Sequence, residues 1–187
     1  MTATTVRSAM ADLIGVINGA NDDVAAVESE IKDAMQALLA LPGLDTAPAQ
    51  STSPPGSPFS TSLLYYDGEF RVVRGTLPAG FVQKPHNHGA WNILAVYKGA
   101  MHYRSYRRAD DGQRLYYADL ELAEDRIMTD GEVTVMPGPP DDIHATAGLA
   151  PSSVTLLIAR EQFLPMREQY MPEMKSYYVI DGEAAAR

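Results

Sequence analysis

The chain has 187 residues, 45% of them hydrophobic, which is enough for one domain with a buried core. Its formal net charge of −9 argues against a nucleic-acid or anionic-membrane partner, because both would require a basic face. The sequence contains no cysteine, so disulfides and thiolate chemistry are excluded. A bound metal would have to be held by nitrogen and oxygen atoms.

The first 41 residues are expected to form helices. Between Val24 and Leu38, apolar residues recur at steps of three and four, as on the buried face of an amphipathic helix. Asn21-Asp22-Asp23 offers a helix cap, so we expect two helices with a break near Asn18-Gly19. Leu41-Pro42-Gly43 stops the second helix. This helical pair would either cover the outside of the main domain or provide a surface for a partner or a homodimer.

Targeting signals are weak. No run approaches the ~20 apolar residues that a membrane-spanning helix needs. The apolar stretch near the start is interrupted by Asp12 and followed by Asn18, which argues against a cleaved signal peptide. We therefore expect a cytoplasmic protein.

Residues 42–61 differ in composition from the segments on either side. They are rich in proline and serine and show no apolar periodicity, which is typical of a linker or an irregular strap. Composition gives no support to the alternative that they wrap the mouth of the main domain. The expected organisation is thus a helical segment (1–41), this linker or strap (42–61), and a main domain with a C-terminal extension (62–187).

From Leu63 onward the apolar period changes to two. Leu63-Leu64-Tyr65-Tyr66 and residues 70–75, separated by a turn at Asp67-Gly68, predict a β-hairpin. Turn signals then recur at short intervals, which indicates an all-β sandwich or barrel. Residues 161–174 have helical character despite two prolines, and residues 176–180 are expected to form a last edge strand before a loose end.

Three of the four histidines suggest a metal site. His86 and His88 are two residues apart on an expected strand, so their side chains point to the same face. His144 follows a second strand-like segment. Together they would form a facial set of three nitrogens with open positions for water, substrate or oxygen. Asn92 has the same parity and would be a weak fourth ligand, a partner for bound water, or a supporting amide behind the ligands.

These histidines lie in a segment that resembles the cupin superfamily. Gly80, His86, His88 and Gly99 fall on the first cupin signature, with Asn92 where that signature has a glutamate. Gly131, Pro137 and His144 resemble the second signature, with the histidine two residues later than usual. The resemblance, which covers roughly residues 61–165, implies an all-β cupin double-stranded β-helix, or jelly-roll barrel, here preceded by the helical hairpin.

Within the cupins, the chain resembles the cysteine dioxygenase group. The resemblance lies in Pro85-His86-Asn87-His88-Gly89-x-Trp91, in Val96-Tyr97-x-Gly99 and in Tyr106-Arg107-Arg108. It implies Fe(II) held by three histidines without a carboxylate, and an iron-dependent dioxygenase that oxidises a small chelating substrate with O2. The substrate would be a thiol or another anion, because three neutral ligands leave the metal its full charge. Zn, Ni and Mn also suit these nitrogens.

Two other functions remain open. A metal-dependent lyase, isomerase or hydrolase would use the metal as a Lewis acid. A non-catalytic cupin would bind a small ligand without turning it over.

In the cysteine dioxygenase group an arginine holds the substrate carboxylate. Arg104 and Arg160 are our main candidates for this role, with Arg74 and Arg167 as further ones, since a guanidinium matches a carboxylate. The fourth histidine, His102, is expected to be a surface or core residue. Trp91 and Tyr97 have the parity opposite to the ligands and are expected to pack between sheets.

One departure from that group concerns a late strand. The group carries Ser-x-His-x-Tyr there, and the matching positions here are Thr155, Leu157 and Ala159. The hydrogen-bonding set is therefore absent. An apolar wall in its place suits a larger or less polar substrate than the small thiols.

Overall fold

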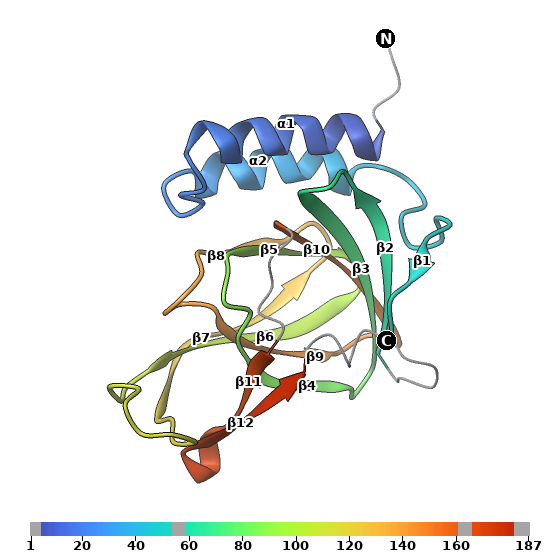
Figure 1. The fold of residues 1–187 in the computed structure, drawn as a ribbon. Coiled ribbons are helices and arrows are strands. Elements are labelled where there is room, and N and C mark those ends of the chain that lie inside the picture. Colours follow the sequence, from blue (N-terminus) through green and yellow to red (C-terminus); the bar gives the residue numbers. More distant parts are fainter. Residues whose placement is uncertain (1–4, 54–58, 161–165, 182–187) are drawn as a thin grey trace.

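The computed structural model describes residues 5–53, 59–160 and 166–181 (Figure 1). Two helices come first, α1 (Val6–Gly19) and α2 (Glu28–Leu39). The strands that follow are β1 (Gln50–Ser51), β2 (Ser60–Tyr66), β3 (Phe70–Pro78), β4 (Val82–His86), β5 (Asn92–Lys98), β6 (Ala100–Arg108), β7 (Leu120–Thr129), β8 (Val133–Met136), β9 (Ile143–Gly148), β10 (Ser152–Arg160), β11 (Met166–Met171) and β12 (Ser176–Asp181). A short 3-10 helix, η1 (Pro172–Met174), joins the last two strands. No helix in these ranges is long and apolar enough to cross a membrane.

The strand pairing is that of a jelly roll. The first of eight consecutive strands pairs with the last and so on inward, which gives the pairs β3–β10, β4–β9, β5–β8 and β6–β7. These nested pairs are distributed over two sheets, with strand orders β1-β2-β3-β10-β5-β8 and β12-β11-β4-β9-β6-β7. Such double sheets are a common way for antiparallel strands to enclose a cavity. The predicted barrel and the predicted β2–β3 hairpin are confirmed.

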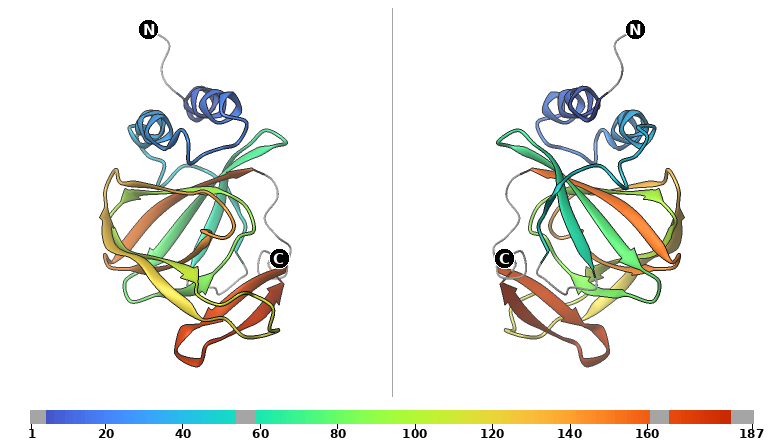
Figure 2. Two further views of the ribbon diagram at one scale, coloured as in Figure 1. Left: turned by 90° about the vertical axis from the view of Figure 1, so that its left-hand side faces the viewer. Right: turned by 90° about the vertical axis from the view of Figure 1, so that its right-hand side faces the viewer.

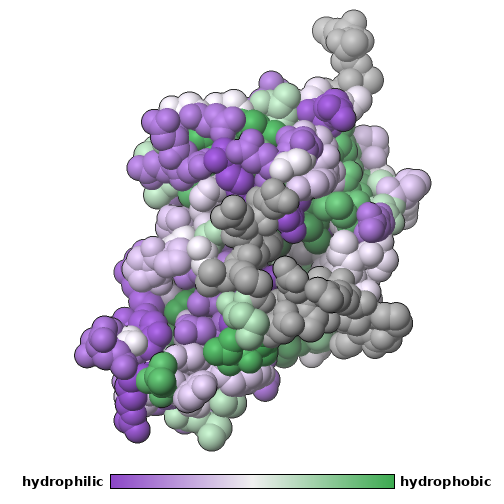
Figure 3. Space-filling model, viewed as in Figure 1, coloured by the Kyte–Doolittle hydropathy of each residue, from purple (hydrophilic) through white to green (hydrophobic). Residues whose placement is uncertain are grey.

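The helical pair lies on the outer face of the first sheet, as Figures 1 and 2 show. One apolar layer joins the two, and its buried residues include Met10, Leu13, Ile17, Ile31, Met35, Leu38, Phe70, Val72, Ile93, Leu156 and Ile158. The surface over the helices is mostly hydrophilic (Figure 3). The helices thus cover the barrel, as the first of the two interpretations proposed.

The break between the helices is longer than expected. α1 ends at Gly19, but α2 begins only at Glu28, with Val27 as its N-cap. The prediction that Asn21-Asp22-Asp23 caps the second helix is therefore wrong. Asn21 and Asp22 have positive φ angles of 52° and 66°, so these residues form a turn and not a helix start.

The segment 42–53 is fastened to the barrel. Arg74 donates hydrogen bonds to the carbonyls of Leu44, Asp45 and Ala47. The hydroxyl of Tyr97 donates to the carbonyl of Leu41 over 2.8 Å. These bonds are those of a strap on the barrel, and residues 54–58 of the predicted linker or strap (42–61) lie outside the described residues.

Two further expectations need correction. Of residues 161–174, the part before Met166 lies outside the described residues, while Met166–Met171 forms β11 and not a helix. Trp91 and Tyr97 do face away from the histidines, but they pack against the layer under the helices and not between the two sheets. The expected edge strand is confirmed as β12, which ends the second sheet, and the expected loose end after it lies outside the described residues.

Candidate metal centre

The structure brings His86, His88 and His144 together in a buried cluster, called here the three-histidine cluster. His86 on β4 lies directly opposite His144 on β9 in the antiparallel register. His88 follows two residues after His86, just beyond the end of β4. One potential ligand atom from each ring lies within 4.8 Å of the other two.

The loop that carries His88 is held by a buried carboxylate. Asp142 accepts a hydrogen bond from the backbone N–H of His88 over 3.1 Å and another from Gly89 over 2.6 Å. Gly89 has a φ of +73°, a conformation that glycine adopts without strain, so the chain can turn here toward β5. Asp142 stands two residues before His144, so one short segment both supplies a ligand and orients another.

The same loop is bound to β11 through Asn87. The backbone N–H of Asn87 donates to the carbonyl of Glu168, and the N–H of Glu168 donates to the Asn87 side-chain oxygen over 2.9 Å. Asn87 Nδ2 also donates to a Glu168 carboxylate oxygen over 3.4 Å. These bonds fix the position of β11 relative to the histidines.

The protonation of the cluster suits a metal. Nδ1 of His86 lies 2.8 Å from the carbonyl oxygen of Lys84, which can only accept, so Nδ1 carries the proton and Nε2 has the lone pair. That buried Nε2 has no hydrogen-bond partner among the described residues. Burial lowers the pKa of His86 to about 4, with a smaller contribution from the positive charge of Arg167. Burial likewise holds the pKa values of His88 and His144 well below their ordinary range.

The donor set fits a divalent transition metal. Three neutral imidazoles at about 2.1 Å from one ion require nitrogens at most ~4.2 Å apart, so small side-chain rotations would complete the site. A backbone carbonyl behind a histidine is the usual support for a metal ligand. No carboxylate of the described residues belongs to the cluster. The identity of the metal does not follow from nitrogen ligands alone.

The cluster borders a cavity of about 560 Å³ between the two sheets, called here the large cavity. This volume falls within the ~300–1,000 Å³ that is usual for small-molecule sites. Its lining is mainly apolar, with a few amides and hydroxyls and two arginines. The described lining residues are Thr52, Ser53, Phe59, Thr61, Leu63, Arg71, Val73, Gly75, Leu77, Phe81, Gln83, His86, His88, Leu94, Met101, His144, Thr146, Thr155, Leu157, Arg167, Gln169 and Ile180.

The charge of this lining is positive. Arg71 comes from β3 and Arg167 from β11, so the two sheets each contribute one guanidinium. The pKa of Arg167 is lowered, first by burial and then by the charge of Arg71. No aspartate, glutamate, lysine or tyrosine occurs among the described lining residues.

The structure does not bring Arg104 or Arg160 to this cavity. Arg104 lies opposite Ala145 on the outer face of the second sheet, while its neighbour Ser105 lies opposite His144. Its Nε donates to Asp125 over 2.9 Å, beside His102, which also contacts Asp125. The expected carboxylate-binding role of Arg104 at the histidines therefore has no geometric support.

Arg160 points to the opposite side of the first sheet. Its guanidinium lies over the Phe70 ring, 4.8 Å from the centroid, under the helical pair. It donates 2.7 Å hydrogen bonds to Asp22 in the turn after α1 and to Asn18 near the end of α1. Arg160 thus fastens the helices to the barrel and is not placed at the cluster.

Asn92 is fully buried at the start of β5. It shares parity with Leu94, which lines the large cavity, but Asn92 is not itself among the lining residues. Neither of its amide atoms has a hydrogen-bond partner among the described residues. A buried amide in this state costs free energy, so Asn92 remains our candidate for a functional residue near the metal.

The late strand is placed as the sequence predicts. Thr155 and Leu157 on β10 line the large cavity, and Ala159 follows them in register with Asn92 and Arg71. No histidine or tyrosine of this strand faces the cluster, so the hydrogen-bonding set of the cysteine dioxygenase group is absent from this wall.

Sequence reasoning missed Arg71 altogether and named Arg167 only as a secondary candidate. The alternation of Arg71 with Val73 and Gly75 was a usable signal for a shared face. The sequence pattern predicts a helix at Arg167, and on a helix Arg167 and Gln169 would not share a face. In the structure both lie on β11, and Gln169 is paired with His86 of the cluster.

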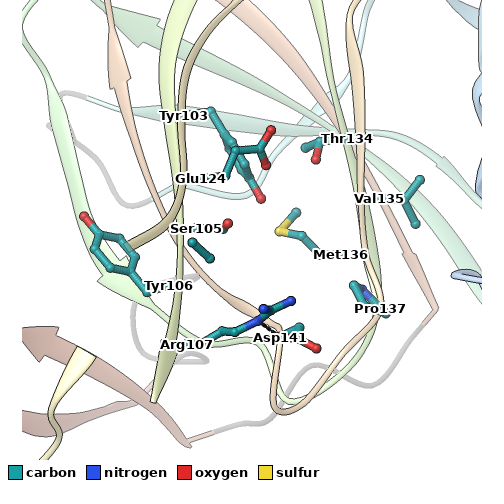
Figure 4. Close-up of a pocket in the computed structure, with 11 residues that line it drawn as sticks. Tyr103, Ser105, Tyr106, Arg107, Glu124, Thr134, Val135, Met136, Pro137 and Asp141 are labelled. Carbon is teal, nitrogen blue, oxygen red and sulfur yellow. Dashed lines mark hydrogen bonds and ion pairs between the residues drawn. The ribbon is translucent and has the colours of Figure 1, made fainter. Parts of the chain in front are cut away.

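A second, smaller cavity of about 160 Å³ lies between β6, β7 and the segment from β8 to Asp141 (Figure 4). Tyr103 forms part of its wall, and the Tyr103 ring centroid lies 6.1 Å from that of His144. Arg107 and Asp141 form an ion pair at its rim. This cavity shares no lining residue with the large cavity.

The nested strand order, with His86 on β4 and His144 on β9, defines the architecture. The fold is a cupin-type jelly roll. No protein-family model matches the sequence, and no curated protein matches it. Similar solved structures include KdgF from Halomonas sp., with 20% identity, a TM-score of 0.45, and coverage of 64% of this chain and 93% of that one.

Two further solved structures are similar at the same level. The DMSP lyases RdDddP and RnDddQII give 15% identity, a TM-score of 0.49, and coverage of 76% and 69%. An RmlC-like cupin from Ralstonia eutropha gives 13% identity, a TM-score of 0.47, and coverage of 74% and 76%. Likeness at this level does not extend to chemistry, and nothing in it concerns the cysteine dioxygenase group.

Proposed function

We propose that this protein is a mononuclear non-haem iron enzyme that oxidises a small, chelating, anionic substrate with dioxygen. The main support is the three-histidine cluster, which is buried, neutral and free of carboxylates at the wall of the large cavity. When bound there, Fe(II) would supply the redox chemistry that allows dioxygen to react with an organic substrate. The step to the cysteine dioxygenase type rests on the sequence resemblance at residues 85–91, 96–99 and 106–108, and on no structural comparison.

The lining of the large cavity favours oxidation over a Lewis-acid reaction. A lyase or isomerase needs a group that accepts and returns a proton within hydrogen-bond reach of the substrate. Among the described lining residues the titratable groups are histidines of the cluster and arginines, and arginine does not lose its proton in this role. Addition of both atoms of dioxygen to a substrate requires no such group from the protein.

The chain's own contribution is therefore to bind, orient and enclose the substrate. Arg71 and Arg167 attract a negative charge, and the apolar walls exclude water from the reacting atoms. Leu157 and Ala159 stand where the cysteine dioxygenase group places a histidine and a tyrosine on this strand. Together with the cavity volume, this replacement favours a substrate larger than a three-carbon thiol.

The test is oxygen consumption by the iron-loaded protein. The assay offers cysteine, mercaptopropionate, cysteamine and a series of enolic and catecholic acids to Fe(II)-loaded protein, with Zn(II)-loaded protein as the matched control. We expect uptake with at least one anionic substrate and none with zinc. Turnover without oxygen consumption, equally fast with zinc, would instead establish the Lewis-acid alternative. Binding without turnover under every metal would establish a ligand-binding protein.

A further inference from the structure

We propose that Phe59 and Phe81 form an aromatic subsite in the large cavity, and that the substrate carries a planar conjugated ring at the end away from its chelating group. The proposal rests on the proposed function only in placing the substrate in the large cavity. It concerns binding, so it can be tested without turnover.

The two rings form one parallel pair in the cavity wall. Their centroids lie 5.7 Å apart, and the angle between the ring planes is 6°. This is an offset-stacked arrangement, at a spacing where aromatic rings attract each other. Both residues line the large cavity, so the Phe59–Phe81 pair presents aromatic surface to a bound molecule.

Phe59 belongs to the strap segment, residues 42–61, and precedes the first strand of the barrel wall. The strap is held nearby by Thr52, whose N–H donates to the carbonyl of Thr61 over 2.9 Å and whose hydroxyl donates to the Thr61 hydroxyl over 2.8 Å. Thr52, Ser53 and Phe59 all line the large cavity. The strap therefore supplies part of the cavity wall, a role that its composition did not indicate.

Space for the Phe59 ring is provided by Gly75 on β3. A Cβ atom at Gly75 would lie 3.1 Å from Cε2 and 3.2 Å from Cζ of Phe59, and 2.6 Å from Oγ1 of Thr155. Gly75 is not among the described glycines with a positive φ, so its backbone conformation does not require glycine. The missing side chain instead lets the Phe59 ring lie close to the β3 backbone.

Phe81 is fixed in the turn between β3 and β4. Its N–H donates to the carbonyl of Pro78 over 3.1 Å, and its carbonyl accepts from the N–H of Gly148 over 3.0 Å. A Cβ atom at Gly148 would overlap the Pro78 carbonyl oxygen, so glycine permits this close approach of β9 to the turn. Both rings thus stand on backbone that is held by hydrogen bonds, and little conformational entropy is lost when a third ring packs against them.

The Phe59–Phe81 pair and the three-histidine cluster lie toward opposite ends of β4. Phe81 immediately precedes Val82, the first residue of β4, and His86 is its last residue. Five residues of extended chain span roughly 15 Å. A molecule whose chelating group reaches the histidines can therefore reach the aromatic pair only if several bonds separate its ring from that group.

A planar conjugated ring suits this surface better than a saturated one. The face of an aromatic ring is negative and its edge is positive, so a further flat ring gains an electrostatic attraction that a puckered ring lacks. A saturated ring of the same size removes more apolar area from water, and a purely hydrophobic wall would therefore prefer it. The contrast between the two kinds of ring separates the proposed subsite from an ordinary apolar wall.

The experiment measures the binding of two neutral probes to Zn(II)-loaded protein by calorimetry. The probes are 4-phenylbutan-1-ol and 4-cyclohexylbutan-1-ol, which share the alcohol and the chain and differ only in the ring. We expect the phenyl probe to bind about fivefold more tightly, as the usual strength of an aromatic pair implies. In Phe59→Leu and in Phe81→Leu this preference should disappear or turn toward the cyclohexyl probe.

The matched control is Tyr116→Leu, which removes an exposed aromatic ring that does not line the large cavity. It should keep the full preference for the phenyl probe. Circular dichroism and zinc stoichiometry would confirm that each variant is folded and loaded, and Phe81→Met would replace Phe81→Leu if the latter does not fold. The proposal is overturned if the wild-type protein binds neither probe, if it binds the cyclohexyl probe as tightly as the phenyl probe, or if either phenylalanine variant keeps the full preference.

These outcomes are separate from those of the proposed function. A phenyl preference that depends on both rings, in a protein that consumes no oxygen with any substrate, would retain the subsite and remove the dioxygenase. Oxygen consumption by a protein that lacks this preference would do the reverse.

Discussion

His86 and His144 are directly opposite each other in the β4–β9 pair, with ring centroids 4.6 Å apart. A cross-strand pair at this spacing can bind one metal ion without movement of the backbone, and His88 adds the third nitrogen from the loop that follows β4. The register of two strands therefore sets the geometry of the candidate metal centre.

Removal of one member of this pair should abolish metal retention. In His144→Ala two nitrogens remain, too few to compete with water for a divalent ion. Metal content after dialysis, measured by mass spectrometry, should fall from about one ion per chain to a small fraction of that. His102→Ala is the control, because His102 lies on the outer face beside Asp125. Full metal content in His144→Ala would contradict the site.

Asp142 should act on metal affinity through His88. In Asp142→Ala the backbone N–H groups of His88 and Gly89 lose their acceptor, so the loop and its ligand are no longer held. Supporting residues of this kind typically change metal affinity by ~10–100-fold. Zinc titration would measure the change. The neighbouring Asp141→Ala should bind zinc as the wild type does, since the Asp141 carboxylate pairs with the exposed Arg107 and is not part of the three-histidine cluster. Equal affinities in the two variants would refute the role of Asp142.

Asn92 should show opposite effects on stability and function. Asn92→Leu removes two buried amide atoms that have no hydrogen-bond partner among the described residues, and it keeps a similar side-chain volume. We expect the free energy of unfolding of the metal-free protein to rise by about 1 kcal/mol or more. Turnover of the substrate found by oxygen uptake should fall at least tenfold if the amide acts near the metal. Urea denaturation and oxygen uptake provide the two measurements. Lower stability with unchanged turnover would assign Asn92 a purely structural role.

The metal-free protein should become less stable as the pH falls below 6.5. In the unfolded chain histidine has a pKa near 6.5, whereas burial lowers the pKa of His86 to about 4 in the folded protein. The unfolded state therefore takes up protons that the folded state does not. The stabilising contribution is complete above pH 6.5 and is lost as the pH approaches 4, in total about 3 kcal/mol for this residue.

Urea denaturation at pH 7.0 and 5.5 would measure this loss in a range where few carboxylates titrate. We expect a decrease of about 1 kcal/mol for each histidine of the cluster. His86→Gln should show a smaller decrease than the wild type, because one titrating group is gone. A stability that is constant or rises over this interval would show that the cluster is not neutral in the folded state.

Local sequence patterns predicted much of the fold and the three histidines of the candidate metal centre. Alternation with period two between turn signals predicted the β2–β3 hairpin and the barrel, because each strand needs only its own residues and its turn. The His86-x-His88 spacing placed two imidazoles on one side for the same local reason. Even the absence of a histidine at Leu157 and of a tyrosine at Ala159 followed from counting along one strand.

The tertiary structure decided which arginines reach the cavity. One face of the first sheet packs against the helical pair, and the other face borders the large cavity. Alternation along a strand shows that Arg71 and Arg160 each point to the opposite face of the sheet from the residues next to them in sequence. It does not show which of the two faces borders the cavity. Arg167 reaches the cavity only because β11 pairs with β4, a contact between residues far apart in the chain. Local patterns determine strands and spacing, whereas long-range packing determines which side chains share a site.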